Sequence, residues 1–98
     1  MPYIKRQKRK ELDPLIDDLT NSLSSVGDYN YAITRLLHSY IVYNGLCYST
    51  LNNAMGVVEC AKQELYRTVI APYEDDKCEE NGAISELDKP HAKRYRSN

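Results

Sequence analysis

The chain has 98 residues, of which 42% are hydrophobic and 28% charged, and its formal net charge at pH 7 is −1. These proportions are typical of one globular domain, and they exclude a disordered chain and a protein built of membrane-spanning helices. Because a domain of this size buries only a modest core, we expect contacts between subunits to supply part of its stability.

The first predicted helix runs from about Asp13 to Ser24. Asp13 is a suitable N-cap, and Pro14 is tolerated in a first turn. The apolar residues at helical spacing are Leu12, Leu15, Ile16, Leu19 and Leu23. Residues 1–10 precede this helix as a basic arm, in which Tyr3 and Ile4 are expected to lie extended against another helix or subunit.

The second predicted helix runs from about Tyr29 to Tyr43. We expect a turn over residues 26–28 and an N-cap at Asp28. A broad apolar stripe follows, made of Tyr31, Ile33, Leu36, Leu37, Tyr40, Ile41 and Tyr43. Gly45 should end the helix, because glycine reaches the left-handed conformation freely.

The third predicted helix is capped by Ser49 or Thr50 and reaches about Ala71, with Leu51, Met55, Val58, Ala61, Leu65 and Val69 at helical spacing. Pro72 interrupts that pattern. The segment 73–77 fits either a short fourth helix or a kinked continuation.

The last part of the chain, residues 82–98, is polar and has no periodicity, so it is predicted to be a mobile tail. The predicted fold is therefore all-α. A helical domain over residues 1–81 forms a small bundle of three main helices plus a short C-terminal helix, and it assembles as a homo-oligomer.

The sequence contains no recognisable catalytic set. His38 has no nearby cysteine or second histidine, and His91 lies in the predicted tail. There is no phosphate loop and no serine-centred elbow. The expectation is a protein that is not an enzyme and has no metal and no cofactor.

The cysteines and the start of the chain bear on localisation. Cys47, Cys60 and Cys78 are irregularly spaced and odd in number, which argues against a disulfide framework. The basic start is followed by acidic residues rather than an apolar run, and no stretch has the length of a membrane span. A cytoplasmic protein without a signal peptide is expected.

Cations are scarce in the middle of the chain. Most basic residues lie in residues 5–10 and 89–96, and the stretch 28–77 keeps only Arg35, Lys62, Arg67 and Lys77. The aromatic residues are nine tyrosines, with no Phe and no Trp. A tyrosine has both a ring and a hydroxyl, which suits interfaces and ligand pockets, although packing between helices explains it equally well.

Two polar helix faces are candidates for binding. Tyr31, Thr34, Arg35 and His38 share one face of the second predicted helix, and the third offers Asn52, Glu59, Lys62, Tyr66 and Arg67. Together these groups could bind a phosphate while a tyrosine stacks on a base. The alternative is a salt bridge between the helices, for instance from Glu59 to Arg35.

Several blocks of the chain resemble a widespread family of short proteins encoded by bacteriophages. The blocks are Pro2–Ile4, Asn30–Leu37 followed by Tyr40 and Asn44–Gly45, Tyr48–Asn52, Gly56–Lys62, Glu64–Arg67 and Ala71–Lys77. The resemblance covers most of residues 1–80, and the tail departs from it.

This resemblance implies an immune-evasion protein in the cytoplasm of an infected bacterium. Such a protein sequesters a cyclic dinucleotide, for example 3′,3′-cGAMP, without cleaving it, and so blocks CBASS antiviral signalling. It implies a homo-oligomer, expected to be a tetramer, with pockets at subunit interfaces. The candidate ligand-binding residues are Tyr3, Tyr31, Arg35, His38, Tyr48, Asn52, Lys62, Tyr66, Arg67, Tyr73 and Lys77.

Two other functions remain open. The helical faces could dock a host or phage protein, so that the chain is a small protein-interaction module. Alternatively, the basic arm could bind nucleic acid. The acidic tract over residues 74–80 and the balanced net charge make nucleic acid the less expected partner. No membrane association is expected.

Overall fold

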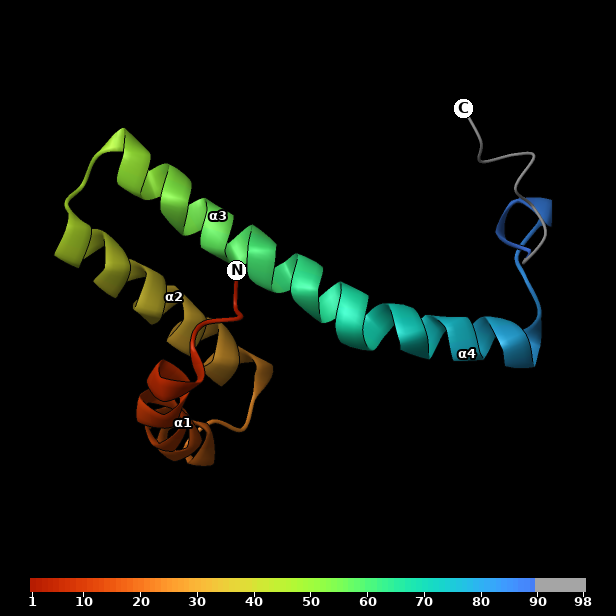
Figure 1. Cartoon of the computed structure of the whole chain (residues 1–98), viewed down its shortest axis with the longest axis horizontal. Coiled ribbons are helices and arrows are strands. Elements are labelled where there is room, and N and C mark those ends of the chain that lie inside the picture. The colour runs from red at the N-terminus through yellow and green to blue at the C-terminus, as the bar shows by residue number, and fades with distance from the viewer. Residues whose placement is uncertain (90–98) are drawn as a thin grey trace. The chain divides into compact units, whose positions relative to one another are not determined.

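A computed structural model describes residues 1–89, and all of the regular structure in this range is helical (Figure 1). The elements are α1 (Arg6–Asn21), α2 (Val26–Asn44), α3 (Tyr48–Leu65), a π-helical turn (Tyr66–Ile70), α4 (Ala71–Asn81) and a 3-10 turn (Glu86–Asp88). The predicted all-α class is confirmed. The chain divides into two units, Met1–Ala61 and Lys62–Asn98, and each is described by itself.

Helix α1 begins earlier than predicted. It starts at Arg6 rather than Asp13 and ends at Asn21, so half of the predicted basic arm is helical and Pro14 lies inside the helix instead of in its first turn. Proline has no amide hydrogen, and it therefore removes one hydrogen bond of the helix. The remaining helical bonds and the good helix formers around Pro14 are enough to continue the helix through it.

The first residues contact α1 through Arg9, and the predicted contact of Tyr3 and Ile4 with another helix or subunit stays a prediction. The Arg9 Nε atom donates a hydrogen bond to the Ile4 carbonyl at 2.8 Å, and the guanidinium lies 5.9 Å from the centroid of the Tyr3 ring. The Ile4 amide also bonds the Pro2 carbonyl at 2.9 Å. The Arg9 guanidinium thus contacts the start of the chain in two ways, by a hydrogen bond to the Ile4 carbonyl and by a cation–π interaction with the Tyr3 ring.

Helix α2 begins with a capping box, so the predicted turn over residues 26–28 is helical instead. Ser25 is the N-cap, and its Oγ atom accepts a hydrogen bond from the Asp28 amide at 3.0 Å. The Asp28 carboxylate accepts in return from the amides of Ser25 (3.2 Å) and Ser24 (3.0 Å). Asp28 is therefore the third residue of the helix, and the reciprocal bonds explain why the helix starts here. Gly45, at φ 95°, ends α2 as predicted.

Acid should weaken this cap. Hydrogen bonds from the Ser24 and Ser25 backbone amides, followed by those from the two serine hydroxyls, lower the pKa of Asp28 to about 2. An aspartate in an unfolded chain titrates near 3.9, so the ionised form stabilises the folded state above about pH 4, and this contribution is lost as the pH falls from about 4 to 2. We expect Asp28→Asn to be less stable than the wild type in urea at pH 7, with the difference disappearing near pH 2. A difference that is equal at both pH values would contradict this assignment.

Helix α3 begins at Tyr48, one residue before the predicted cap. The Cys47 carbonyl accepts the first helical hydrogen bond, from the Leu51 amide at 3.0 Å, so Ser49 and Thr50 lie inside the first turn rather than at the cap. Of the two alternatives for residues 73–77, the structure has the continuation: α4 follows the preceding helical segment without a break, with Pro72 in its first turn.

A π-helical turn joins α3 to α4 over Tyr66–Ile70, where the Ala71 amide bonds the Tyr66 carbonyl. In an uninterrupted α-helix the ring of Pro72 would clash with the carbonyl four residues earlier. The wider turn immediately before Pro72 relieves that clash without ending the helical backbone.

Residues 82–89 have more structure than predicted for the tail. Gly82, at φ 91°, ends α4, and Ser85 caps the 3-10 turn by accepting a hydrogen bond from the Leu87 amide at 3.2 Å. Asp88 accepts from the Ser85 amide at 2.9 Å. The rest of the predicted tail, including His91, lies outside the described residues.

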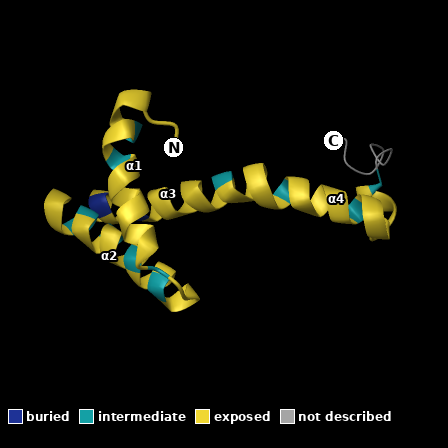
Figure 2. Cartoon of the chain, turned by 90° about the horizontal axis from the view of Figure 1, so that it is seen from below, coloured by how far each residue is buried: buried dark blue, intermediate teal, exposed yellow. Residues whose placement is uncertain are grey.

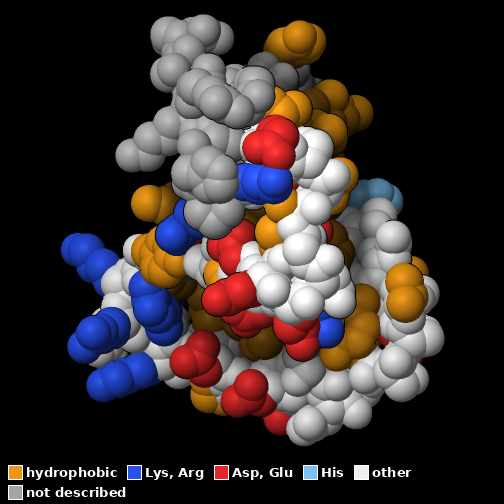
Figure 3. Space-filling view, turned by 90° about the vertical axis from the view of Figure 1, so that its right-hand side faces the viewer, with side chains coloured by type: hydrophobic (Ala, Val, Ile, Leu, Met, Phe, Trp, Pro, Cys, Tyr) orange, Lys and Arg blue, Asp and Glu red, His pale blue; other side chains and the backbone are white. Residues whose placement is uncertain are grey.

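Almost no side chain in the described part of the chain is buried (Figure 2). In residues 1–89 only Thr50 and Ala54 are, and both lie on one face of α3. The apolar stripes predicted for the core are present on the helices, but Leu15, Ile33 and Met55 are exposed. Hydrophobic side chains reach the surface between charged ones on the face drawn in Figure 3.

Candidate functional site

The unit Met1–Ala61 contains an open hollow of about 420 Å³ between the end of α1 and one face of α2. Its lining residues are Leu19, Leu23, Tyr31, Ala32, Arg35, Leu36 and Ser39. Arg35 provides the one charged group among them, and leucines provide most of the apolar wall. A guanidinium beside apolar surface suits a ligand that combines an anionic group with a ring.

Within this hollow, Tyr31 and Arg35 lie one turn apart on α2. The Arg35 Nη1 atom donates a hydrogen bond to the Tyr31 hydroxyl at 3.4 Å, which directs the guanidinium along the tyrosine side chain. Within residues 1–89 Arg35 makes no salt bridge, and the proposed pair with Glu59 is not formed. Its remaining N–H groups are therefore available to an anionic ligand.

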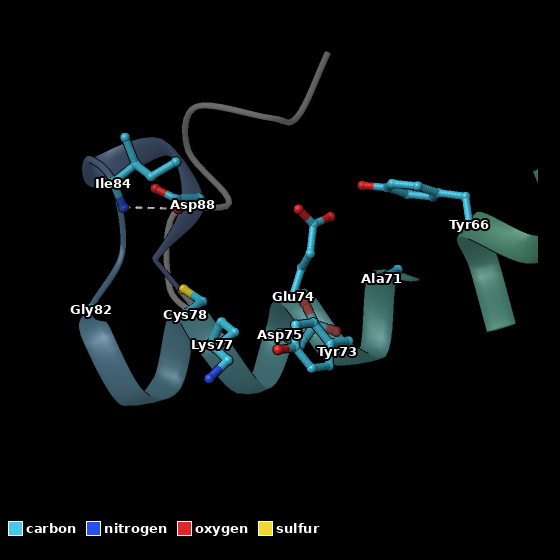
Figure 4. Close-up of a pocket in the computed structure, with 10 residues that line it drawn as sticks. All are labelled: Tyr66, Ala71, Tyr73, Glu74, Asp75, Lys77, Cys78, Gly82, Ile84 and Asp88. Atoms are coloured by element: carbon cyan, nitrogen blue, oxygen red, sulfur yellow. Dashed lines mark hydrogen bonds between the residues drawn. The ribbon is translucent and has the colours of Figure 1, made fainter. Parts of the chain in front are cut away.

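A second hollow, of about 560 Å³, lies in the unit Lys62–Asn98. Its described lining residues are Tyr66, Ala71, Tyr73, Glu74, Asp75, Lys77, Cys78, Gly82, Ile84 and Asp88 (Figure 4). Three carboxylates and one ammonium group line it. This excess of negative charge opposes binding of a phosphate.

The ammonium group in this second hollow already has contacts. Lys77 Nζ lies 3.2 Å from a carboxylate oxygen of Glu80 and 5.6 Å from the centroid of the Tyr73 ring. Both contacts come from residues three or four positions away on α4, so they follow from helix geometry. The Asp88 carboxylate is likewise held by the Ile84 amide at 3.0 Å.

Arg67 is paired locally. Its Nη2 atom lies 2.6 and 2.9 Å from the two carboxylate oxygens of Glu64, and its Nε atom lies 3.3 Å from one of them. This bidentate arrangement satisfies the guanidinium within its own helical segment. A phosphate that binds Arg67 would have to displace the Glu64 carboxylate. A phosphate that binds Arg35 displaces no carboxylate of residues 1–89.

The predicted site residues that line a hollow are divided between two hollows, one within each unit. Tyr31 and Arg35 line the first hollow, and Tyr66, Tyr73 and Lys77 line the second. Six predicted residues line neither: Tyr3, His38, Tyr48, Asn52, Lys62 and Arg67. All six are exposed.

The sequence analysis does not single out the apolar part of the first hollow as a site. Leu19, Leu23 and Leu36 belong to the predicted apolar stripes, and Ser39 belongs to no predicted site. Nothing in the local sequence separates a leucine that covers a ligand from one that packs against a helix. Only the tertiary structure brings Leu19 and Leu23 beside Arg35, whereas Leu36 and Ser39 are on α2 with it.

Cys47 has an unusual environment that the sequence analysis missed. Its Sγ atom lies 3.5 Å from the Ser49 hydroxyl and 3.3 Å from the Thr50 hydroxyl. Hydrogen bonds from these two side chains, together with backbone hydrogen bonds from Thr50 and Ser49, lower the pKa of the thiol to about 7. A cysteine two residues before a Ser-Thr pair at the start of a helix was the available signal.

Cys47 should therefore react fastest among the three thiols. With a pKa near 7, about half of it is thiolate at neutral pH, and the thiolate is the nucleophile. We expect iodoacetamide at pH 7 to modify Cys47 before Cys60, as measured by peptide mass spectrometry. The Ser49→Ala variant should shift the pH midpoint of Cys47 alkylation upward. An unchanged midpoint would contradict the role of the Ser49 hydroxyl.

Two further findings concern metals and membranes. In residues 1–89 no three side chains of the His, Cys, Asp or Glu type are grouped so that they could hold a metal ion. None of the helices described combines the length and the apolar character needed to cross a bilayer.

The comparisons with known proteins place the chain in a family. A family model described as "Domain of unknown function (DUF6899)" matches residues 1–84, which include α1 to α4. No curated protein matches the chain, and no solved structure does.

Proposed function

The chain belongs to the DUF6899 family, whose function is unknown, and from its own residues we propose that it binds and sequesters a cyclic dinucleotide such as 3′,3′-cGAMP without cleaving it. The observation that supports this most directly is the Arg35 guanidinium, which has no carboxylate partner within residues 1–89 and lies in a hollow with an aromatic ring and an apolar wall.

Each part of the hollow matches a part of such a ligand. The Arg35 N–H groups can donate charge-assisted hydrogen bonds to a phosphate. Tyr31 is 66% exposed, so its side chain can stack on a base. Leu19 and Leu36 offer apolar surface to the rest of the nucleoside. Sequestration requires tight binding alone, so it needs no nucleophile, metal ion or general base.

The ligand carries two phosphates, whereas the hollow has one guanidinium. We therefore expect two copies of the chain to bind one ligand, each through its own Arg35. This expectation makes the protein a homo-oligomer with ligand sites shared between subunits. The resemblance to phage proteins supports the biological role, in which removal of the free messenger blocks CBASS signalling in the infected cell.

Calorimetry tests the proposal. Titration with 3′,3′-cGAMP, cyclic di-GMP and cyclic di-AMP should give heat for at least one of them, with a stoichiometry of one ligand per two chains. GMP and AMP are the matched mononucleotide controls. Chromatography of the ligand released by denaturation should recover it intact. The proposal fails if no cyclic dinucleotide binds at micromolar protein, or if the released ligand is hydrolysed.

A second candidate function is docking of another protein, and the exposed apolar residues on all three main helices favour it. In that case a stoichiometric host or phage protein should co-purify with the tagged chain from infected cells, and no nucleotide should produce heat. The two candidates are thus separated by the same calorimetric titration.

A further inference from the structure

Basic side chains are concentrated at the beginning of α1. Lys5 is the N-cap of this helix, and Arg6, Lys8, Arg9 and Lys10 follow it. Cations at the N-terminus of a helix are repelled by the partial positive charge there, and the first turn of α1 contains no acidic residue that would offset them. The helix therefore gains no stability from this arrangement.

Local contacts compensate little of this charge. Lys8 Nζ lies 3.2 Å from a carboxylate oxygen of Glu11. The other four cations have no carboxylate partner within residues 1–89, and we name them the α1 basic cluster: Lys5, Arg6, Arg9 and Lys10. Three of the four are exposed, and Arg9 is half-buried. Arg6 and Lys10 lie one turn apart, so they are neighbours on one face of α1.

An aromatic ring lies beside this cluster. The centroid of the Tyr3 ring is 5.9 Å from the Arg9 guanidinium, and Tyr3 is 53% exposed. The hydrogen bond from Arg9 Nε to the Ile4 carbonyl, at 2.8 Å, holds the same segment against α1. Proteins that bind single-stranded nucleic acid without sequence preference combine cations along the phosphate backbone with a ring on which a base stacks.

We infer that the α1 basic cluster and Tyr3 bind a single strand of nucleic acid. The four cations contact phosphates, and the Tyr3 ring stacks on a base. A duplex fits less well, because its bases are already stacked on one another and present no open face to Tyr3. This inference does not depend on the cyclic dinucleotide proposed above, because none of these five residues lines the hollow that contains Arg35.

The charges elsewhere on α1 favour a strand over an anionic membrane surface. Glu11, Asp13, Asp17 and Asp18 follow the cluster on the same helix. A flat bilayer that contacted α1 along its length would repel these carboxylates, whereas a strand can cross only the beginning of the helix. The acidic tract over residues 74–80 belongs to α4, in the other unit, so it does not neutralise the cluster within its own unit.

Fluorescence anisotropy of the full chain with a labelled oligo-dT tests the inference. An oligonucleotide of about 12 residues should bind at micromolar protein in about 25 mM salt, and four phosphate contacts should give a slope of about −3 for the logarithm of the association constant against that of the salt concentration. A duplex of the same length and vesicles of phosphatidylcholine and phosphatidylglycerol should bind more weakly. The inference is overturned if the oligonucleotide does not bind, or if the duplex or the vesicles bind as tightly.

Variants locate the contacts. Lys10→Gln should weaken binding about tenfold in about 25 mM salt, and the double variant Arg6→Gln, Lys10→Gln should reduce the slope to about −1.5. Lys89→Gln is the matched control, because it removes the same charge from a residue that is paired with Glu86. It should bind as the wild type does. Equal losses in Lys10→Gln and Lys89→Gln, with unchanged circular dichroism, would show that the cluster is not the site.

The stacking contact has a separate readout. Tyr3→Ala should weaken binding at least about fivefold and leave the salt slope unchanged, because the ring carries no charge. Tyr3→Phe keeps the ring and should retain the wild-type affinity. If Tyr3→Ala binds the strand as tightly as the wild type, or if Tyr3→Phe loses as much affinity as Tyr3→Ala, the proposed stacking is wrong.

Discussion

Replacing Arg35 with alanine is expected to weaken binding of 3′,3′-cGAMP by roughly one to two orders of magnitude. Hydrogen bonds to charged groups contribute about 1.5–3 kcal/mol, and Arg35 is the one cation that the first hollow offers to a phosphate. Calorimetry of the purified variant measures the change. Arg35→Lys should fall between the variant and the wild type, because it keeps the charge but loses the planar pair of donors.

Arg67→Ala is the matched control for this prediction. Both residues are exposed arginines on helices, but the guanidinium of Arg67 is held by the Glu64 carboxylate, and that of Arg35 has only the Tyr31 hydroxyl among the described residues. We expect Arg67→Ala to bind the ligand as the wild type does. Equal losses in both variants, with unchanged circular dichroism, would contradict the assignment of the ligand to the first hollow.

Replacing Ala54 with leucine is expected to lower the free energy of unfolding by about 1–3 kcal/mol, the usual effect of adding methylene groups at a well-packed position. Ala54 is 6% exposed, so a larger side chain must displace its neighbours. Urea unfolding followed by circular dichroism measures the change at one fixed protein concentration.

Asn53→Leu is the control for Ala54→Leu. Asn53 precedes Ala54 on α3 and is exposed, so the same side chain should change stability by no more than about 0.5 kcal/mol there. If the two variants unfold alike, then the face of α3 that carries Ala54 is not packed against the rest of its unit.

Salt bridges to carboxylates on the same helix distinguish the candidate phosphate-binding cations from one another. Among the four cations in the middle of the chain, Lys77 and Arg67 have carboxylate partners three residues away, and Arg35 has none within residues 1–89. The Arg67 and Lys77 partners sit at positions that helix geometry predicts. Carboxylates three residues from Arg67 and Lys77 are therefore a signal in the sequence that these two cations are paired and that Arg35 is the better candidate.

The sequence also contains local signals for the helix boundaries. The sequence analysis predicts that α2 starts at about Tyr29 with Asp28 as its N-cap, although the Ser25-x-x-Asp28 spacing is itself a capping signature. The stop at Gly45 was predicted correctly, because the positive φ angle there is a property of one residue and needs no information from elsewhere in the chain.

Helicity follows from interactions within a few residues, so the amino-acid order was sufficient to establish the all-α class, the apolar stripes and the stop at Gly45. The environment of Arg35 is different, because Leu19 and Leu23 reach it only when α1 packs beside α2. Burial also depends on packing between segments far apart in the chain. Periodicity indicates which face of a helix is apolar, but the three-dimensional structure shows that members of these stripes such as Ile33 and Met55 are exposed.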